Sequence, residues 1–158
     1  MKKVLMVFVI LMIVASTSAF AVKGAGLAIG GEGALYLDGS GGLPVAAMLT
    51  LHLPGLPLIL GIGVDEPLGL GLTADYWLGH GNLKGIFDWY AGVGAYLAVY
   101  FNPTDIAIGA RIPLGIQMWA FGETLEIFLE VAPAVGVYTA PTAFWWHIQA
   151  ALGFRIWF

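Results

Sequence analysis

Apolar and polar residues alternate along most of the chain, and this period of two is typical of β-strands that have one apolar face. The alternation is clearest at the C-terminus, where every even position from Phe144 to Phe158 is apolar. The polar side chains of this segment, including His147 and Arg155, all occupy odd positions. Strands of soluble proteins usually have 3–10 residues, so the length of this pattern favours a strand that crosses a bilayer.

The same alternation recurs through the rest of the chain, with the charged residues of each segment on one face only. Clusters of Gly, Pro, Asn and Asp separate the segments and indicate turns. An even number of antiparallel strands of about nine residues or more is typical of membrane barrels. The sequence therefore predicts an all-β fold, an eight-stranded antiparallel up-and-down transmembrane β-barrel. The expected strands cover about 24–37, 43–53, 58–64, 68–78, 86–101, 105–119, 124–137 and 144–158.

The first 21 residues have the organisation of a secretory signal peptide. Lys2 and Lys3 precede an apolar run over 4–14, and Ala19-Phe20-Ala21 forms a small-x-small cleavage site. An uncleaved anchor helix is the alternative, but a membrane-spanning helix needs about 20 apolar residues. We therefore expect residues 1–21 to be removed and residues 22–158 to form the barrel.

Composition supports a membrane protein and excludes several other classes. Of the 158 residues, 59% are hydrophobic and 10% are charged, whereas a soluble domain has about 25% charged residues. The longest candidate for a membrane helix, 43–64, is interrupted by three prolines and by His52. The net charge of −4 has the wrong sign for binding nucleic acid. The absence of Cys excludes disulfides and a thiol nucleophile.

Charged residues that the alternation places inside the barrel form the candidate functional site. A barrel of eight strands is just wide enough for side chains to fill it. We therefore expect a buried network of salt bridges and hydrogen bonds, and a proton or cation path is the alternative. The residues of this lumen polar network are Glu32, Asp75, Asp88, Arg111, Glu126, Glu130, His147 and Arg155.

The last hairpin allows its register to be predicted. If its turn is centred near 140–141, the numbers of opposite residues sum to about 281, which pairs Glu126 with Arg155 near one rim. Arg111 and Glu130 should meet diagonally, deeper in the lumen. Removing one member of a buried pair costs more than removing one from a rim pair, so Arg111→Ala is expected to destabilise the protein more than Arg155→Ala.

The six tryptophans lie near the ends of the expected strands, which suggests interfacial aromatic girdles. Packing inside the lumen is the alternative for those on the inward face. Trp77, Trp89, Trp119 and Trp157 are expected at one rim, and Trp145 and Trp146 at the other.

Catalytic chemistry has little support. Ser40 is the one serine after residue 21 and lies in a Gly-rich turn, while His52 and His147 are expected to face the lumen and His80 to lie in a turn. A zinc site needs three or four converging ligands, and no paired histidine spacing is present. We expect a protein that is not an enzyme and that needs no cofactor or metal.

The chain resembles the small eight-stranded outer-membrane barrels of the OmpA/OmpX-like class. A terminal Phe158 on an aromatic-rich strand resembles the signal that the outer-membrane assembly machinery reads. The segment Arg111-Ile112-Pro113-Leu114-Gly115, with 125–133, resembles an uncharacterised family of small barrels associated with spirochaetes. The resemblance implies a monomer in the outer membrane of a diderm bacterium, with the lipid bilayer and the assembly machinery as partners.

The predicted function is a compact outer-membrane barrel with a structural or lipid- and surface-interaction role. Receptor barrels usually carry long outer loops, whereas the expected outer loops, 38–42, 65–67, 102–104 and 138–143, are short. A narrow pore or proton-conducting channel is the alternative, and a barrel enzyme acting on lipid has the least support.

Overall fold

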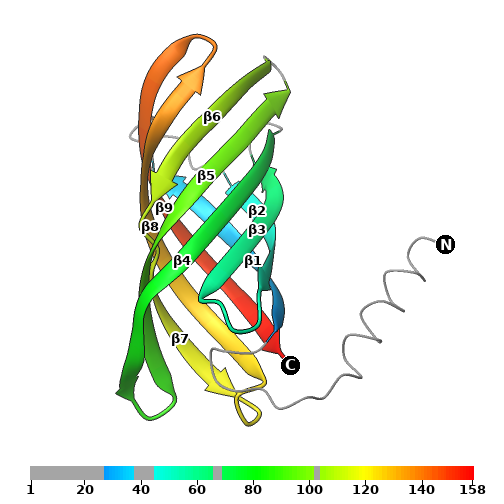
Figure 1. The fold of residues 1–158 in the computed structure, drawn as a ribbon, viewed down its shortest axis with the longest axis vertical. Coiled ribbons are helices and arrows are strands. Elements are labelled where there is room, and N and C mark those ends of the chain that lie inside the picture. Colours follow the sequence, from blue (N-terminus) through cyan, green and yellow to red (C-terminus); the bar gives the residue numbers. More distant parts are fainter. Residues whose placement is uncertain (1–26, 38–44, 66–68, 102–103) are drawn as a thin grey trace, which may run out of the picture.

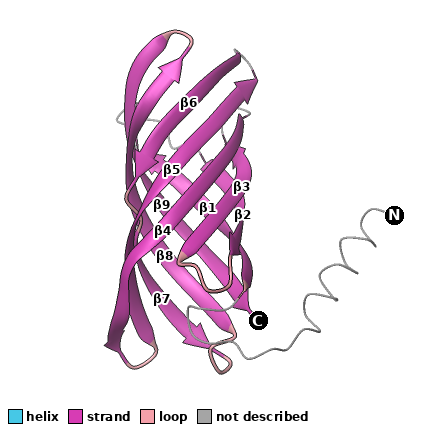
Figure 2. Ribbon diagram, in the orientation of Figure 1, coloured by secondary structure: helices cyan, strands magenta, loops and turns pink. Residues whose placement is uncertain are grey.

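The structure, a computed structural model, describes residues 27–37, 45–65, 69–101 and 104–158, so the expected signal peptide lies outside the described residues. These residues form antiparallel strands that wind around a common axis (Figures 1 and 2). The strands are β1 (Ala28–Leu37), β2 (Val45–His52), β3 (Leu58–Asp65), β4 (Gly69–Lys84), β5 (Phe87–Phe101), β6 (Thr104–Arg111), β7 (Leu114–Ala120), β8 (Leu125–Thr139) and β9 (Thr142–Trp157).

The sheet closes on itself. Apart from β6 and β7, each strand pairs with its neighbour in sequence, and β1 pairs with β9 from Ala28 opposite Trp157 to Leu37 opposite Ile148. Segments β6 and β7 each pair with both β5 and β8, so they are two halves of one crossing. The described residues therefore run up or down the barrel wall eight times. This confirms the predicted up-and-down barrel.

The crossing expected as one strand over 105–119 is broken at Ile112 and Pro113. Proline cannot donate to the strand ladder, and the pairing with β8 runs from Arg111 opposite Ala134 to Leu114 opposite Val131, which leaves Ile112 and Pro113 between the two segments. Backbone bonds at the break still hold the wall together. Ile112 N donates to Pro133 O at 2.9 Å, and Gly92 N donates to Pro113 O at 2.9 Å.

The hairpin between β4 and β5 is longer than predicted. A turn was expected at 79–82, but β4 continues through His80 to Lys84. The register shifts between Trp77 and Gly79 and again between Asn82 and Lys84. These irregularities interrupt the period of two, and the glycines at 79 and 81 resembled turn residues in the sequence.

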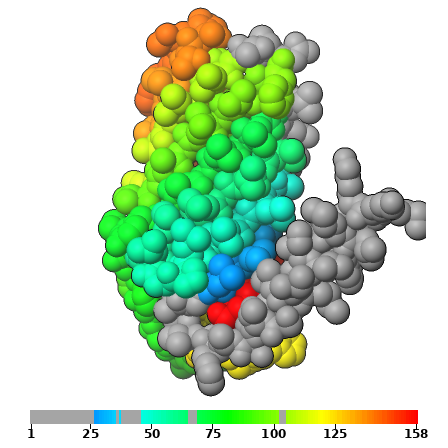
Figure 3. Space-filling model, turned by 45° about the vertical axis from the view of Figure 1, so that its right-hand side comes forward, coloured from blue at the N-terminus to red at the C-terminus, as the bar shows by residue number. Residues whose placement is uncertain are grey.

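Alternation of burial along the strands confirms the predicted faces. In β8, buried residues from Glu126 to Ala134 alternate with exposed apolar residues such as Leu129. Large apolar side chains cover the outside of the barrel, as a lipid-facing surface requires. None of the residues that the structure describes forms a helix long and apolar enough to span a bilayer. In the space-filling view, the β8–β9 hairpin rises above the other strands at one end (Figure 3).

The expectation of tryptophan girdles is wrong for four of the six tryptophans. Trp77, Trp119, Trp145 and Trp157 are buried inside the barrel, whereas Trp89 and Trp146 are exposed on its outside. The four buried residues occupy inward positions, where large rings fill the narrow interior. Their nearness to strand ends was therefore a weaker guide than the face on which they lie.

Inward glycines make room for these rings. A Cβ on Gly115 would lie 2.1 Å from Cζ of Tyr90, and Cβ atoms on Gly109 and Gly136 would lie within 2.6 Å of the Trp145 ring. The interior is thus packed to the point where a single methyl group on the wall would collide with a ring.

Gly115→Ala should destabilise the barrel by about 1–3 kcal/mol, because the tightly packed Tyr90 ring cannot move without disturbing its neighbours. Gly33→Ala is the matched control, since a Cβ on this outward glycine of β1 would meet nothing within 4 Å. Urea unfolding in lipid vesicles measures both variants. Equal stability of the two would contradict the packing described.

Candidate functional site

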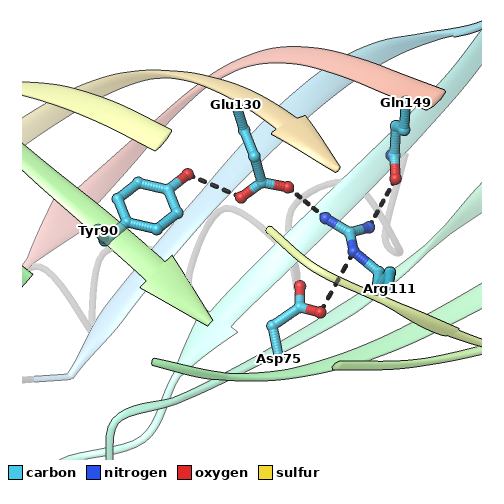
Figure 4. Close-up of polar contacts among 5 residues, drawn as sticks. All are labelled: Asp75, Tyr90, Arg111, Glu130 and Gln149. Carbon is cyan, nitrogen blue, oxygen red and sulfur yellow. Dashed lines mark hydrogen bonds and ion pairs between the residues drawn. The ribbon is translucent and has the colours of Figure 1, made fainter. Parts of the chain in front are cut away.

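The Arg111 side chain lies in the lumen and contacts side chains from three other strands. Its Nη2 donates to Glu130 Oε1 on β8, its Nη1 donates to Gln149 Oε1 on β9 at 2.7 Å, and its Nε lies 3.3 Å from Asp75 Oδ1 on β4 (Figure 4). Arg111 is the last residue of β6, just before the break at Pro113. Because the side chain is only 2% exposed, these bonds replace the water that a guanidinium would otherwise bind.

Tyr90 extends this cluster on the side of β5. Its hydroxyl donates to Glu130 Oε2 at 2.7 Å, so both carboxylate oxygens of Glu130 have donors (Figure 4). The Tyr90 ring also stacks on Trp77, with ring centroids 4.5 Å apart. The predicted diagonal contact between Arg111 and Glu130 is confirmed.

The second ion pair joins Glu126 and Arg155, which are opposite partners in the β8–β9 ladder, as the predicted register requires. Arg155 Nη1 donates to Glu126 Oε1 at 2.5 Å, and Trp157 Nε1 donates to Glu126 Oε2 at 2.7 Å. The Arg155 guanidinium lies 3.9 Å from the centroid of the Phe128 ring, which is a cation–π geometry. The predicted pairing is confirmed.

The expected difference in burial between the two pairs is wrong. Arg155 is 2% exposed and Glu126 is 0% exposed, much like Arg111 and Glu130. The rings of Trp119 and Trp157 lie 5.5 Å apart at this end of the lumen and help to exclude water from Glu126. Burial therefore gives no reason for Arg111→Ala to be more destabilising than Arg155→Ala.

Asp88 forms a third polar cluster with neutral donors. Trp119 Nε1 donates to Asp88 Oδ2 at 2.8 Å, and Asn82 Nδ2 donates to Asp88 Oδ1 at 2.7 Å. Asn82 also donates to the carbonyls of Gly85 and Phe87, so the same cluster holds the end of the β4–β5 hairpin.

The two remaining members of the predicted network are only half-buried. His147 stacks on Trp145 with ring centroids 4.8 Å apart, and Tyr96 packs edge-on against both rings. Glu32 lies beside Gly153 on the neighbouring β9. The structure thus joins six of the eight predicted residues into three clusters and places these two beside them.

The structure adds partners that the sequence analysis did not assign to the network. Tyr90, Trp119, Trp157 and Gln149 all lie on inward positions, and each provides a bond to a buried charged group. Their inward position was the available signal. For the tryptophans it was overridden by the expectation of girdles.

Of the residues considered for catalysis, the structure describes the histidines but not the serine. His52 is fully buried and its ring lies 4.6 Å from that of Trp157, while Ser40 lies outside the described residues. Within the described ranges, no three His, Asp or Glu side chains form a group that could hold a metal ion.

A double-mutant cycle on Glu126 and Arg155 should show coupling of about 0.5–3 kcal/mol. Each alanine substitution strands a buried partner, which costs about 3–5 kcal/mol, and the double variant should be less destabilised than the sum. Urea unfolding of the folded barrel measures all four proteins.

Glu126→Ala combined with Val93→Ala provides the control, because Val93 is exposed on the outside of β5 and should be additive. Additivity of the Glu126 and Arg155 variants would show that the ion pair contributes nothing specific.

Comparisons with known proteins agree with the architecture. No family model and no curated protein matches the sequence. Among solved structures, the chain is similar to Neisserial surface protein A, with a TM-score of 0.57 and 10% sequence identity. The match covers 85% of this chain and 98% of the neisserial chain. At this identity the likeness concerns the fold alone, a closed antiparallel β-barrel.

Proposed function

We propose that the protein is a compact, monomeric barrel of the outer membrane of a diderm bacterium, that it acts through its outer surface and that its lumen is closed to ions. The observation that carries this proposal is the Arg111 cluster, which ties β4, β6, β8 and β9 together across the interior. A water-filled pore would leave these charged groups hydrated, whereas here they bond to one another.

Aromatic layers on both sides of the Arg111 cluster support a closed lumen. Tyr96 and Trp145 pack together with three alanines in one buried cluster. Tyr90 and Trp77 pack with Ile59 and Phe128 in another. A path for a hydrated ion would have to displace rings that are at most 8% exposed.

A narrow cation- or proton-conducting channel is the second candidate. It is favoured by the excess of acid, since four carboxylates and two guanidiniums are buried in the described part of the lumen. A negative interior would attract cations. The neutral donors around Asp88, and the pairing of Glu130 with Arg111 and Tyr90, instead favour a structural role for these carboxylates.

An enzymatic role has no supporting geometry, and we propose that the protein is not an enzyme. The narrower resemblance to spirochaete barrels rests on 111–115 and 125–133, and Ile112 N in the first segment donates to Pro133 O in the second at the break in the wall. That resemblance brings no activity with it.

Planar-bilayer recordings should show no conductance above the bare membrane for the wild-type protein. The double variant Arg111→Ala/Arg155→Ala, which removes both guanidiniums and leaves the carboxylates, should leak cations if it still shows a heat-dependent shift on gels. Discrete wild-type channels would contradict the closed lumen and favour the second candidate.

Deleting Phe158 should lower the amount of folded protein in cell membranes while leaving spontaneous folding in detergent largely intact. The reason is that Phe158 adds little to the wall, where its N–H donates to Leu27 O at 2.8 Å, but completes the expected assembly signal. Heat-modifiable gel migration measures both. Unchanged assembly in cells would show that the residue is not read.

A further inference from the structure

The barrel wall is much shorter on one side than on the other. β2 and β3 have eight residues each, whereas β4, β5, β8 and β9 have 15 or 16. Only three residues separate β3 from β4, so this hairpin has little room to lengthen. A strand that crosses a bilayer needs about 9–11 residues. The described part of the β2–β3 wall is therefore shorter than a bilayer crossing requires, whereas the opposite wall is long enough.

The outer surface of this short wall also lacks aromatic anchors. The exposed large side chains of β2 and β3 are aliphatic: Leu49, Ile62 and Val64. Among the side chains whose exposure the structure describes, the exposed aromatic residues of the strands belong to β4, β5 and β9: Tyr76, Phe87, Trp89, Phe101, Phe144, Trp146 and Phe154. Aromatic side chains at the barrel surface mark the level of the lipid headgroups, so nothing holds those headgroups at a fixed height beside β2 and β3.

The turn between β2 and β3 is built to tolerate an apolar environment. Its sequence, Leu53-Pro54-Gly55-Leu56-Pro57, contains no polar side chain. Leu53 N donates to Leu58 O and Leu56 N donates to Leu53 O, each at 3.3 Å, and the two prolines have no N–H. Gly55 carries the remaining donor. The carbonyls of Pro54, Gly55 and Leu56 accept none of the backbone hydrogen bonds of this turn, so it is the side chains of the turn, more than its backbone, that suit contact with acyl chains.

The two other turns at the same end of the barrel differ in both position and chemistry. Lys84 is the last residue of β4 before the β4–β5 turn, and the β7–β8 turn contains Glu123. Both turns lie further along the barrel axis than the β2–β3 turn (Figure 1). The charged residues at these two turns suit water. The apolar β2–β3 turn instead lies at a height along the barrel axis where β4 and β5 still continue (Figure 1).

A polar edge borders the space beyond the short turn. Pairing between β3 and β4 ends at Leu58 opposite Tyr76, and Trp77 N donates to Pro57 O at 2.7 Å. From there to Lys84, β4 pairs with β5 but with no described strand on its other side. This edge presents backbone N–H groups, together with the exposed side chains of His80 and Lys84.

We propose that this side of the barrel is a phospholipid-binding surface on which the bilayer is locally thinned. Acyl chains cover the Leu53–Pro57 turn, and lipid phosphates accept hydrogen bonds from the free edge of β4 and from Lys84. A wall shorter than the surrounding hydrocarbon is accommodated by thinning of the bilayer. The inference rests on the proposed membrane placement and gives its lipid-interaction role a defined surface.

Single-cysteine probes test the proposal cleanly because the chain has no native Cys. Leu56→Cys places a probe on the apolar turn, Phe121→Cys on the β7–β8 turn, and Leu129→Cys on the lipid-facing belt of β8. Each variant is reconstituted in phosphatidylcholine–phosphatidylglycerol vesicles and freeze–thawed with a membrane-impermeant maleimide, so that the reagent reaches both sides. A second set is labelled in detergent with a fluorophore and quenched by lipids that carry doxyl groups on their acyl chains.

We expect Leu56→Cys to react at least tenfold more slowly with the maleimide than Phe121→Cys, and its fluorophore to be quenched by acyl-chain doxyl groups, as at Leu129→Cys. If Leu129→Cys is quenched and Leu56→Cys reacts as fast as Phe121→Cys, the inference is overturned while the barrel remains a membrane protein. If Leu129→Cys is not quenched either, the proposed membrane placement itself fails.

The headgroup contact has its own readout. His80→Gln/Lys84→Gln should lower the phosphorus that remains bound per protein after detergent extraction and repeated washing. Glu123→Gln is the matched control at the neighbouring turn and should not lower it. Equal bound phosphorus in the His80/Lys84 variant and the wild type would overturn the assignment of phosphate to this edge.

Discussion

The lack of space inside a closed eight-stranded wall is the constraint on which the rest of the structure depends. Charged side chains on inward positions have no room for water, and an unpaired buried charge is strongly unfavourable. The fold meets this constraint by pairing Arg111 with Asp75 and Glu130, and Arg155 with Glu126. Neutral donors on Tyr90, Trp119 and Trp157 bond to the carboxylates of Glu130, Asp88 and Glu126, respectively. The side chains of the interior therefore link strands on opposite sides of the barrel, so that the lumen is cross-braced.

Much of this arrangement could be predicted because a strand has a strict period of two. Once Glu126 and Arg155 were placed on the inward face, the turn near 140–141 was enough to make them opposite partners. The same period could not reveal the break at Pro113, since one proline inside an otherwise regular strand does not change the alternation on either side. It also failed along β4, where two register shifts interrupt the alternation.

The roles of the tryptophans could not be decided from the sequence because two physical explanations fit the same positions. A tryptophan near a strand end can anchor the barrel in the headgroup region or fill the lumen. Trp89 and Trp146 are exposed on the outside of the barrel, as the first role requires, whereas Trp119 and Trp157 take the second and bond to buried carboxylates. The strand lengths could not be predicted from the sequence either. The short β2–β3 side and the long β4–β5 hairpin depend on where each turn begins.

Exchange of the indole N–H groups with D2O tests the closed, cross-braced lumen most directly. Six indole signals in a nitrogen-15 spectrum of the folded protein can be assigned by Trp→Phe substitution. The N–H groups of Trp119 and Trp157 should persist long after those of the outward Trp89 and Trp146 have exchanged, and Glu126→Gln should accelerate Trp157 alone. Exchange of all four at similar rates would mean that water enters the lumen and would contradict this account.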